Sequence, residues 1–420
     1  MEVEKISACR VCGGLSIKPF FDLGDQPLAN SLPASAGEKE NFYPLSLSFC
    51  TDCNLVQLNH TVDPKILFSQ YVWVTGTSKT ANDFSEKFYK ELIARRGSEK
   101  GGYVLEVASN DGTFLRPFMR DGYVVLGIDP AKNIAEIANK NGVPTEPLFF
   151  ANDIAKDIVE KRGQASMIFA RNVLAHVANP HDFTEGMYAA LADDGVLAIE
   201  VHYAKIILEG LHYDSIYHEH LCYFTLKSLE KLLGDHGLYV FDVIASPISG
   251  GAMIVYARKT KTEPSERVYE YRNQEKESKT NELASWQEFA KRSFAHKEKL
   301  LEKLGEIKKK LLGILEDKKM RVVGWGSSAR SSTMLNFCGV DSRMLPVIID
   351  LNPLKQGRWT AGTRIPIAQP EAVLGLKPDY VLILAWNFAD EIMEMLKTKY
   401  NFRGRCIIPL PEFKVVDMSK

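Results

Sequence analysis

The sequence has no long hydrophobic run, no marked excess of charge and few cysteines, and each absence excludes a class of protein. Its longest apolar runs, such as LPVIID and YVLILAW, have the length of a strand, far short of the roughly 20 residues that span a membrane. The net charge is −1, which gives no case for a nucleic acid or an anionic membrane as partner. The first residues, MEVEKISACR, are acidic and polar, unlike a secretory signal.

Seven cysteines are present, and four of them form two C-x-x-C pairs. The other three, Cys222, Cys338 and Cys406, are scattered, as in a reducing compartment rather than a disulfide framework. Apolar residues make up 45% of the chain and charged residues 25%, the profile of a globular protein. We therefore expect a cytoplasmic protein.

A length of 420 residues favours two or three domains over one. Residues 1–75 are rich in turns and contain the cysteine pairs. Residues 76–300 alternate continuous apolar runs with amphipathic stretches, which is typical of a parallel sheet covered by helices, and end in charged linking helices. Strand–helix alternation restarts within residues 301–420. The predicted fold class is α/β: an N-terminal zinc-binding module, a central Rossmann-like domain and a C-terminal Rossmann-like domain.

The two cysteine pairs are Cys9 with Cys12 and Cys50 with Cys53. Each pair can hold one side of a tetrahedral ion, and four thiolates suit Zn²⁺ without leaving an open coordination position. Neither pair follows a strand at the start of a predicted helix, where a redox C-x-x-C is expected. We predict a structural zinc site.

The segment VLEVASNDGTFLRPF predicts a strand, a loop from Ser109 to Gly112, and a helix. Glu106, at the strand end, can hold the loop backbone or a ligand's amino group, and Gly112 allows a close backbone approach. Asp129 ends the next strand, where a carboxylate grips a ribose diol. The loop lacks a full G-x-G-x-x-G, which suits S-adenosylmethionine (SAM) because this cofactor has no phosphates. The predicted SAM-binding residues are Glu106, Asn110, Asp111, Gly112, Asp129, Pro130 and Asn172.

Histidine is scarce, with nine residues, yet three of the nine crowd into LHYDSIYHEHLCYFT. His176 ends the predicted strand IFARNVLAH, and the crowded segment follows another predicted strand. Ligands bind at the carboxyl ends of such strands, so we expect His176, Tyr217, Glu219 and His220 to meet there. A positioned imidazole can remove a carbon-bound proton beside a carbonyl, and a Tyr hydroxyl can hydrogen-bond the resulting enolate.

In this order, the motifs CRVCGG, FDLGDQPLAN, YVWVTGTS, EVASNDGTFL and DSIYHEHLCYFT resemble those of SAM-dependent nucleotide-sugar C-methyltransferases. The type resembled has three domains and acts at C3 of dTDP-linked 4-keto-deoxysugars. GWGSSARSSTMLN, IIDLNPLKQG and LAWNFADEI continue the resemblance, which covers nearly the whole chain.

The resemblance implies a zinc module, a SAM-binding domain and a C-terminal domain that helps to hold a nucleotide sugar, dTDP-linked or related. It implies that His220 abstracts the proton beside the ketone, with Tyr217 and Glu219 next to it. His176 matches a second active-site histidine, and Tyr71 matches a tyrosine ahead of the SAM domain. The same motif contains Trp73.

Two other functions fit parts of the sequence. Gly324, Gly326 and Ala329 form a G-x-G-x-x-A, followed by Asp350, which taken alone predicts an NAD(P)-dependent oxidoreductase. In the methyltransferase interpretation the same turn faces a diphosphate, with Lys355 as a nearby cation, or serves strand–helix packing alone. A zinc-ribbon RNA methylase is the other alternative, and the near-neutral charge argues against it. We expect a monomer with a small-molecule substrate.

Overall fold

The computed structural model describes residues 2–68, 74–97, 101–312 and 322–419. The chain divides into two compact units that exchange segments along the sequence. Unit 1 comprises Met1–Pro19, Leu47–Ile206 and Glu219–Leu283. Unit 2 comprises Phe20–Ser46, Ile207–His218 and Ala284–Lys420. Within the described ranges, no helix has the length and apolar character needed to cross a membrane.

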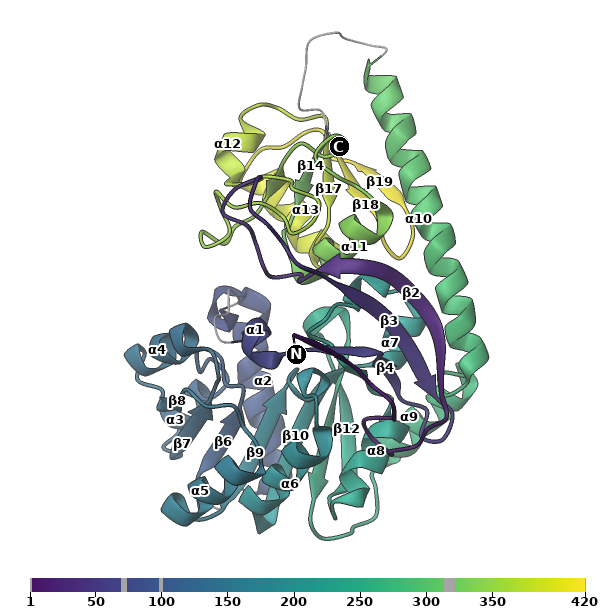
Figure 1. Cartoon of the computed structure of the whole chain (residues 1–420). Helices are drawn as coiled ribbons and strands as arrows, with labels where there is room; N and C mark the ends of the chain where they lie inside the picture. Colours follow the sequence, from purple (N-terminus) through teal and green to yellow (C-terminus); the bar gives the residue numbers. More distant parts are fainter. Residues whose placement is uncertain (1, 69–73, 98–100, 313–321, 420) are drawn as a thin grey trace. The chain divides into compact units, whose positions relative to one another are not determined.

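Unit 1 is built on a seven-stranded sheet with the order β12-β13-β10-β9-β6-β7-β8 (Figure 1). Strands β6 to β10 pair in parallel with one another, and β13 is antiparallel to both β10 and β12. The strands are β6 (Val104–Val107), β7 (Val125–Ile128), β8 (Thr145–Glu146), β9 (Ala165–Arg171), β10 (Leu191–His202), β12 (Tyr239–Ser246) and β13 (Ala252–Arg258).

The central strands are buried on both faces, as their continuous apolar sequences predict. One face packs against α2 (Lys79–Arg96), whose Phe84, Phe88 and Leu92 belong to the same core cluster as Phe169 of β9. The other helices of this unit are α1 (Pro64–Phe68), α3 (Arg116–Arg120), α4 (Lys132–Lys140), α5 (Asn152–Arg162), α6 (Pro180–Ala190), α8 (Leu226–Asp235) and α9 (Glu266–Glu277). Helix α7 (Ala204–Glu209) passes from unit 1 into unit 2.

A smaller sheet has the strand order β11-β4-β3-β2. Its strands are β2 (Ile17–Pro27), β3 (Phe42–Cys50), β4 (Val56–Leu58) and β11 (Cys222–Tyr223). Strands β2 and β3 each run from one unit into the other. Strand β4 pairs antiparallel with both β3 and β11, so a strand from late in unit 1 extends the N-terminal sheet. Separately, β1 (Val3–Lys5) pairs with β5 (His60–Val62).

Unit 2 contains a second α/β sheet, with the order β16-β15-β14-β17-β18-β19. Its strands are β14 (Val322–Trp325), β15 (Ile348–Ile349), β16 (Ile367–Ala368), β17 (Tyr380–Ile383), β18 (Arg405–Ile408) and β19 (Lys414–Asp417). All pair in parallel except β19. Its helices are the long α10 (Leu283–Leu312), α11 (Ala329–Cys338), α12 (Pro370–Leu374) and α13 (Ala389–Thr398) (Figure 1).

The predicted fold class is confirmed, with two α/β sheets and an N-terminal cysteine-containing module. The charged stretch that the sequence assigned to linking helices forms α9 and α10. One local prediction was wrong: His176 does not end a strand. Strand β9 stops at Arg171, Asn172 adopts φ 51°, and the chain then forms the short 3₁₀ helix η2 (Leu174–His176). The apolar residues after Asn172 therefore belong to a turn rather than to the sheet.

Candidate active site and zinc centre

The four predicted zinc ligands meet at one point in unit 1. Their sulfur atoms all lie within 4.8 Å of one another. The Sγ atoms of Cys9 and Cys53 are 3.5 Å apart, as are those of Cys12 and Cys50. Sulfurs bound to one tetrahedral Zn²⁺ at about 2.3 Å are separated by about 3.8 Å. The arrangement therefore fits a closed four-thiolate zinc site.

Two tight turns set this geometry. The Cys9 N–H donates to the Gly14 carbonyl, and the Gly13 N–H donates back to the Cys9 carbonyl. Gly13 has φ 68°, a left-handed conformation that glycine adopts without strain. In the second turn the Asn54 N–H donates to the Cys50 carbonyl at the end of β3. Each C-x-x-C pair is thus folded so that its two thiols point the same way.

The predicted SAM loop follows β6, and Asp129 follows β7, the adjacent parallel strand. The Asp129 carboxylate accepts hydrogen bonds from the N–H groups of Asn110, at 2.9 Å, and Ala131, at 3.0 Å. These bonds fix the loop against the neighbouring strand end. Burial raises the pKa of Asp129 above its ordinary value, although the two N–H donors oppose the rise. The loop therefore lies at the carboxyl edge of the sheet, where ligands of such sheets bind.

Glu106 is almost completely buried, with an exposed fraction of 2%. Its Oε2 atom has no hydrogen-bond partner among the residues that the structure describes. Burial raises the pKa of its carboxyl well above the ordinary value, and the positive charge of Arg171 only partly opposes this. A buried acceptor without a partner fits a bound cation or ammonium group, since an unmade hydrogen bond is costly. The site therefore fits the amino group of SAM.

The other predicted SAM residues serve the loop in different ways. Gly112 has φ 76°, and a Cβ there would lie 2.6 Å from Val143, so only glycine fits. The Asp111 side chain is held by Thr113, whose hydroxyl donates to Oδ1 at 2.7 Å, and by Gly76, whose N–H donates to Oδ2 at 3.2 Å. The structure thus gives Asp111 a loop-building role.

Asn110, Asn172 and Pro130 complete the predicted set. The Asn110 side chain accepts a hydrogen bond from the Thr75 N–H at 2.8 Å. Asn172 follows β9, and its N–H donates to the Glu200 carbonyl at 2.8 Å. Pro130 comes directly after Asp129 and is partly exposed. All three lie at the carboxyl ends of β6, β7 and β9.

His176 and His220 face each other in unit 1, with ring centroids 4.9 Å apart. Phe68 stacks on His176 at 5.5 Å, and the ring of His202, at the end of β10, lies 6.4 Å from that of His220. Burial lowers the pKa of His176 to about 4. Its Nε2 atom has no hydrogen-bond partner among the described residues, so this neutral ring can bond a ligand.

The main chain holds the two histidines together. The Leu221 N–H, next to His220, donates to the Ala175 carbonyl, next to His176, at 2.7 Å. Glu219 is buried and belongs to unit 1, whereas Tyr217 belongs to the segment of unit 2 that precedes it. The predicted Tyr71, together with Trp73, lies outside the described residues. The structure therefore brings His176 and His220 together at the same edge of the sheet as the SAM loop.

Sequence reasoning missed a buried ion pair beneath this edge. Arg171 and Glu200 are neighbours across β9 and β10, and the Arg171 Nε donates to the Glu200 carboxylate at 2.6 Å. The Ser246 hydroxyl donates to the other carboxylate oxygen at 2.7 Å. The guanidinium also lies 3.2 Å from the ring centroid of Phe114. The sequence did contain a signal for this pair: each of two apolar strands includes one charged residue, and the two charges are opposite. Because isolated buried charges are rare, such residues are expected to pair.

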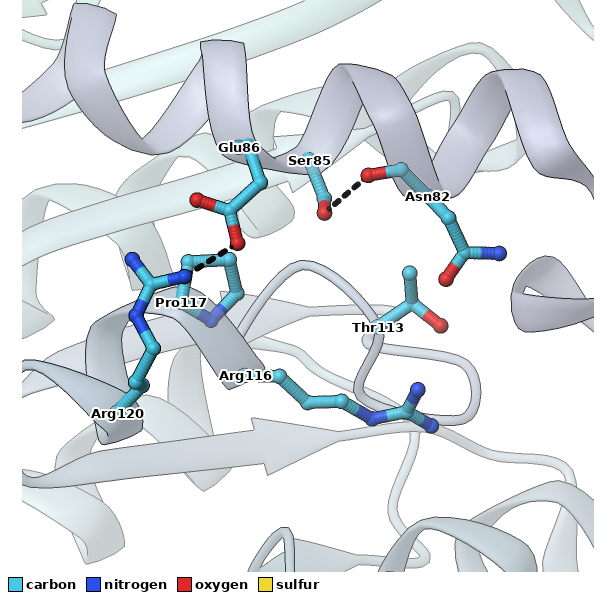
Figure 2. Close-up of a pocket in the computed structure, with 7 residues that line it drawn as sticks. All are labelled: Asn82, Ser85, Glu86, Thr113, Arg116, Pro117 and Arg120. Carbon is cyan, nitrogen blue, oxygen red and sulfur yellow. Dashed lines mark hydrogen bonds and ion pairs between the residues drawn. The ribbon is translucent and has the colours of Figure 1, made fainter.

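A surface hollow of about 390 Å³ lies between α2 and α3 and contains none of the predicted cofactor residues (Figure 2). Its cations are already paired: Arg120 with Glu86 at 2.6 Å, and Arg116 with Asp111 at 3.3 Å. Thr113, which also lines it, bonds Asp111. The hollow is therefore next to the SAM loop, and its two arginines are already ion-paired.

The glycine-rich turn of unit 2 is filled by its own side chains. The Ser327 N–H donates to Asp350 at 2.7 Å, and the Lys355 ammonium donates to the Ser327 carbonyl at 2.6 Å. A Cβ on Gly324 would lie 2.8 Å from Ile348, and one on Gly326 would lie 2.7 Å from Ala385. These glycines serve close strand packing, and Lys355 is a buried partner of the turn.

Comparisons with known proteins agree with this geometry. Three family models match along the chain: a zinc binding domain over residues 9–68, a methyltransferase domain over residues 82–243 and a C-methyltransferase C-terminal domain over residues 247–411. The C-methyltransferase NovU of Streptomyces niveus is 34% identical over 418 residues, which cover 99% of this chain and 98% of NovU.

Two solved structures are similar to part of the chain. Magnesium protoporphyrin IX methyltransferase from Synechocystis PCC 6803, with bound SAM, covers 43% of this chain and 79% of its own, at 14% identity and a TM-score of 0.33. A SAM-dependent methyltransferase from Anabaena variabilis covers 46% and 90%, at 15% identity and a TM-score of 0.34. The full-length match to NovU and the three domain matches are decisive. The chain belongs to the C-methyltransferase family, with a methyltransferase domain that uses SAM and an N-terminal module that binds zinc.

Proposed function

We propose that this enzyme transfers a methyl group from SAM to a carbon of a nucleotide-linked 4-keto-deoxysugar, dTDP-linked or related. The observation that carries the proposal is the apposition of His176 and His220, 4.9 Å apart. Their loops meet at the carboxyl edge of β9, in the sheet whose β6 contains Glu106 and whose β7 is followed by Asp129. The motif resemblance and the family match support a small-molecule ketone as the substrate class.

Methylation at carbon needs both a ketone and a base, because a C–H bond becomes acidic only beside a carbonyl. We assign the base to His220, since imidazole has an ordinary pKa near neutrality. It takes the proton from C3 while the electron pair moves into the enolate. When bound, SAM supplies an electrophilic methyl group. We assign to the hydroxyl of Tyr217 the hydrogen bond to the enolate oxygen, with Glu219 next to it in the motif and Tyr71 as a further proposed contact.

His176 has a different role in this scheme. Burial lowers its pKa to about 4, so at neutral pH it is uncharged and has one N–H and one acceptor nitrogen. Such a ring orients a sugar hydroxyl or carbonyl by hydrogen bonding and does not compete for the proton. In the same scheme, Asp129 binds the ribose of SAM and Glu106 binds its amino group.

The test separates deprotonation from cofactor binding. A dTDP-4-keto-6-deoxyhexose is incubated in deuterium oxide with His220→Asn, and exchange at C3 is followed by NMR. We expect both exchange and methyl transfer to be lost while S-adenosylhomocysteine still binds in calorimetry. Survival of exchange would show that another residue is the base. If S-adenosylhomocysteine binding is lost as well, the substitution disturbs the site more widely than the loss of a base.

We also propose a monomer organised as residues 1–75, 76–300 and 301–420. The first range contains the zinc cysteines, the second the SAM loop and histidine pair, and the third the second sheet. Light scattering of the purified chain tests the monomer. A dimer whose dissociation abolishes activity would contradict it.

A further inference from the structure

Leu221, the residue after His220, makes main-chain hydrogen bonds to two different parts of unit 1. Its N–H donates to the Ala175 carbonyl at 2.7 Å, and its carbonyl accepts from the Leu58 N–H at 2.9 Å. Ala175 precedes His176, and Leu58 ends β4 of the N-terminal sheet. Leu221 is therefore a junction between the two histidines and the zinc module.

Leu58 is held in turn by Arg10, which lies between the zinc ligands Cys9 and Cys12. The Arg10 guanidinium donates to the Leu58 carbonyl at 2.5 Å and to the Thr61 hydroxyl at 2.8 Å. The Arg10 N–H donates to the side-chain oxygen of Gln57 at 3.0 Å. A continuous path of hydrogen bonds thus runs from the cysteine turn through β4 to the peptide beside His220.

Arg10 is an unusual residue to find in this place. Its exposed fraction is only 9%, and burial lowers the pKa of its guanidinium. Charged side chains are rarely buried unless they are paired. Four thiolates around Zn²⁺ carry a formal charge of about −2, which a neighbouring cation complements. The planar guanidinium also donates hydrogen bonds in fixed directions, whereas a lysine ammonium can rotate its donors freely.

We propose that Arg10 is a positioning residue for the histidine pair. It ties the Cys9–Cys12 turn to β4, so that Leu221 holds His220 opposite His176. The assignment of His220 as base rests on the proposed function, whereas the hydrogen bonds that carry this inference do not. The zinc module accordingly acts on the reaction through the main chain and needs no contact with substrate.

Four variants test the proposal. Arg10→Met keeps the apolar stem but removes the donors, Arg10→Lys keeps the charge but removes the fork, and Thr61→Val removes one acceptor. The control is Arg95→Met, because Arg95, on α2, is similarly buried and pairs with Asp242 of β12 at 2.7 Å. Each full-length variant is assayed for bound zinc, for S-adenosylhomocysteine affinity, and for kcat and KM on a dTDP-4-keto-6-deoxyhexose.

The decisive readout is NMR of the histidine ring C–H groups at one pH, with His176 and His220 assigned from their Asn variants. In Arg10→Met we expect both ring signals to shift or broaden while zinc and S-adenosylhomocysteine remain bound. A displacement of about 1 Å at a reacting group can cost 10²-fold, so we expect kcat to fall about 10–100-fold with KM changed by less. The kcat of Arg10→Lys should lie between those of Arg10→Met and the wild type. Arg95→Met should leave the histidine ring signals and kcat unchanged.

Unchanged ring signals and kcat in Arg10→Met would overturn the proposal, as would equal effects in Arg95→Met. If Arg10→Met does not fold, Arg10→Lys and Thr61→Val decide, and wild-type behaviour in both would overturn it. The proposed function is tested separately. If His220→Asn still exchanges the substrate proton, His220 is not the base. Shifted histidine ring signals in Arg10→Met would still show that Arg10 positions the histidine pair.

Discussion

Three buried polar atoms at the active edge of the first sheet lack hydrogen-bond partners among the described residues: Glu106 Oε2, Ser109 Oγ and His176 Nε2. Each such atom costs about 1–3 kcal/mol if nothing bonds it. Glu106 belongs to β6, Ser109 begins the SAM loop that follows, and His176 lies on the turn after β9. Native proteins satisfy nearly all buried polar groups, so a ligand bound at this edge would supply the partners that these three atoms lack.

Glu106→Gln should weaken SAM binding by about 10–100-fold, because a hydrogen bond to a charged group contributes about 1.5–3 kcal/mol. Burial raises the pKa of Glu106, whereas the SAM ammonium favours the ionised carboxylate. Binding should therefore release a proton at pH values where free Glu106 is protonated, and the glutamine variant should release none there. Calorimetry in buffers of different ionisation enthalpy measures both effects, with the half-exposed Glu185→Gln as control. Equal affinity and equal proton release would contradict the role of Glu106.

His176 should make the protein less stable in mild acid. Its folded pKa of about 4 lies below the ordinary value of about 6.5, so the unfolded chain binds more protons between these values. The free energy of unfolding should thus rise with pH across this window and be lost as pH falls from 6.5 toward 4. For this partly exposed ring we expect about 1–3 kcal/mol. Urea unfolding of His176→Asn should show a flatter profile there, and an unchanged slope would refute the assignment.

At the scale of elements, the short 3₁₀ helix η3 (Tyr213–Ser215) is anchored within unit 2 by a buried carboxylate. Asp214 has an exposed fraction of 0% and accepts hydrogen bonds from Nη2 and Nε of Arg330, on α11, at 2.9 and 3.0 Å. The Trp386 indole N–H donates to the same carboxylate at 2.7 Å. Thr333, also on α11, donates to the carbonyl of Ile216. The segment that precedes the histidine motif is thus built into the second sheet's domain.

Arg330→Met should cost about 3–5 kcal/mol, because it leaves the Asp214 charge buried without its cation. Trp386→Phe removes only one hydrogen bond from the same carboxylate and should cost about 1–3 kcal/mol. Urea denaturation of the full chain, followed by far-UV circular dichroism, compares the two. A cost for Arg330→Met no greater than that for Trp386→Phe would contradict the ion pair as the anchor of η3.

The sequence predicted those features that are local. Parallel strands buried on both faces give continuous apolar runs, and the spacing of Cys9, Cys12, Cys50 and Cys53 is itself a zinc pattern. Hydrophobicity could not distinguish the end of β9 from the turn that carries His176, because both are apolar.

Long-range partners were beyond sequence reasoning. Asp214 pairs with Arg330, which lies 116 positions away in the sequence. Strand β11 pairs with β4, although most of the sequence of unit 1 lies between them. Nothing in the local sequence of either partner identifies the other, since these contacts depend on the order in which strands enter each sheet. The same holds for Leu221, whose two hydrogen bonds connect the zinc module to the turn of His176.

At the scale of the whole molecule, the zinc module contains strands that continue into both units. Cys50 ends β3, which pairs with β4, and β4 pairs with β11 next to the histidine motif. Unfolded chains rarely hold a preformed metal site, so the free energy of zinc binding contributes directly to folding. Loss of the ion should therefore lower the stability of the assembled chain, beyond the residues that bind it.

Cys50→Ser should lose zinc and lower the thermal unfolding midpoint together. The control is Cys406→Ser, because Cys406 is equally buried, on β18 of unit 2, and does not belong to the cysteine cluster. Zinc release is measured with a chromogenic chelator after denaturation, and unfolding by differential scanning calorimetry. We expect the control to keep its zinc, and added Zn²⁺ not to restore the midpoint of Cys50→Ser. A Cys50→Ser protein that is zinc-free yet folded and fully active would show that the ion neither stabilises the module nor positions the histidine pair through it.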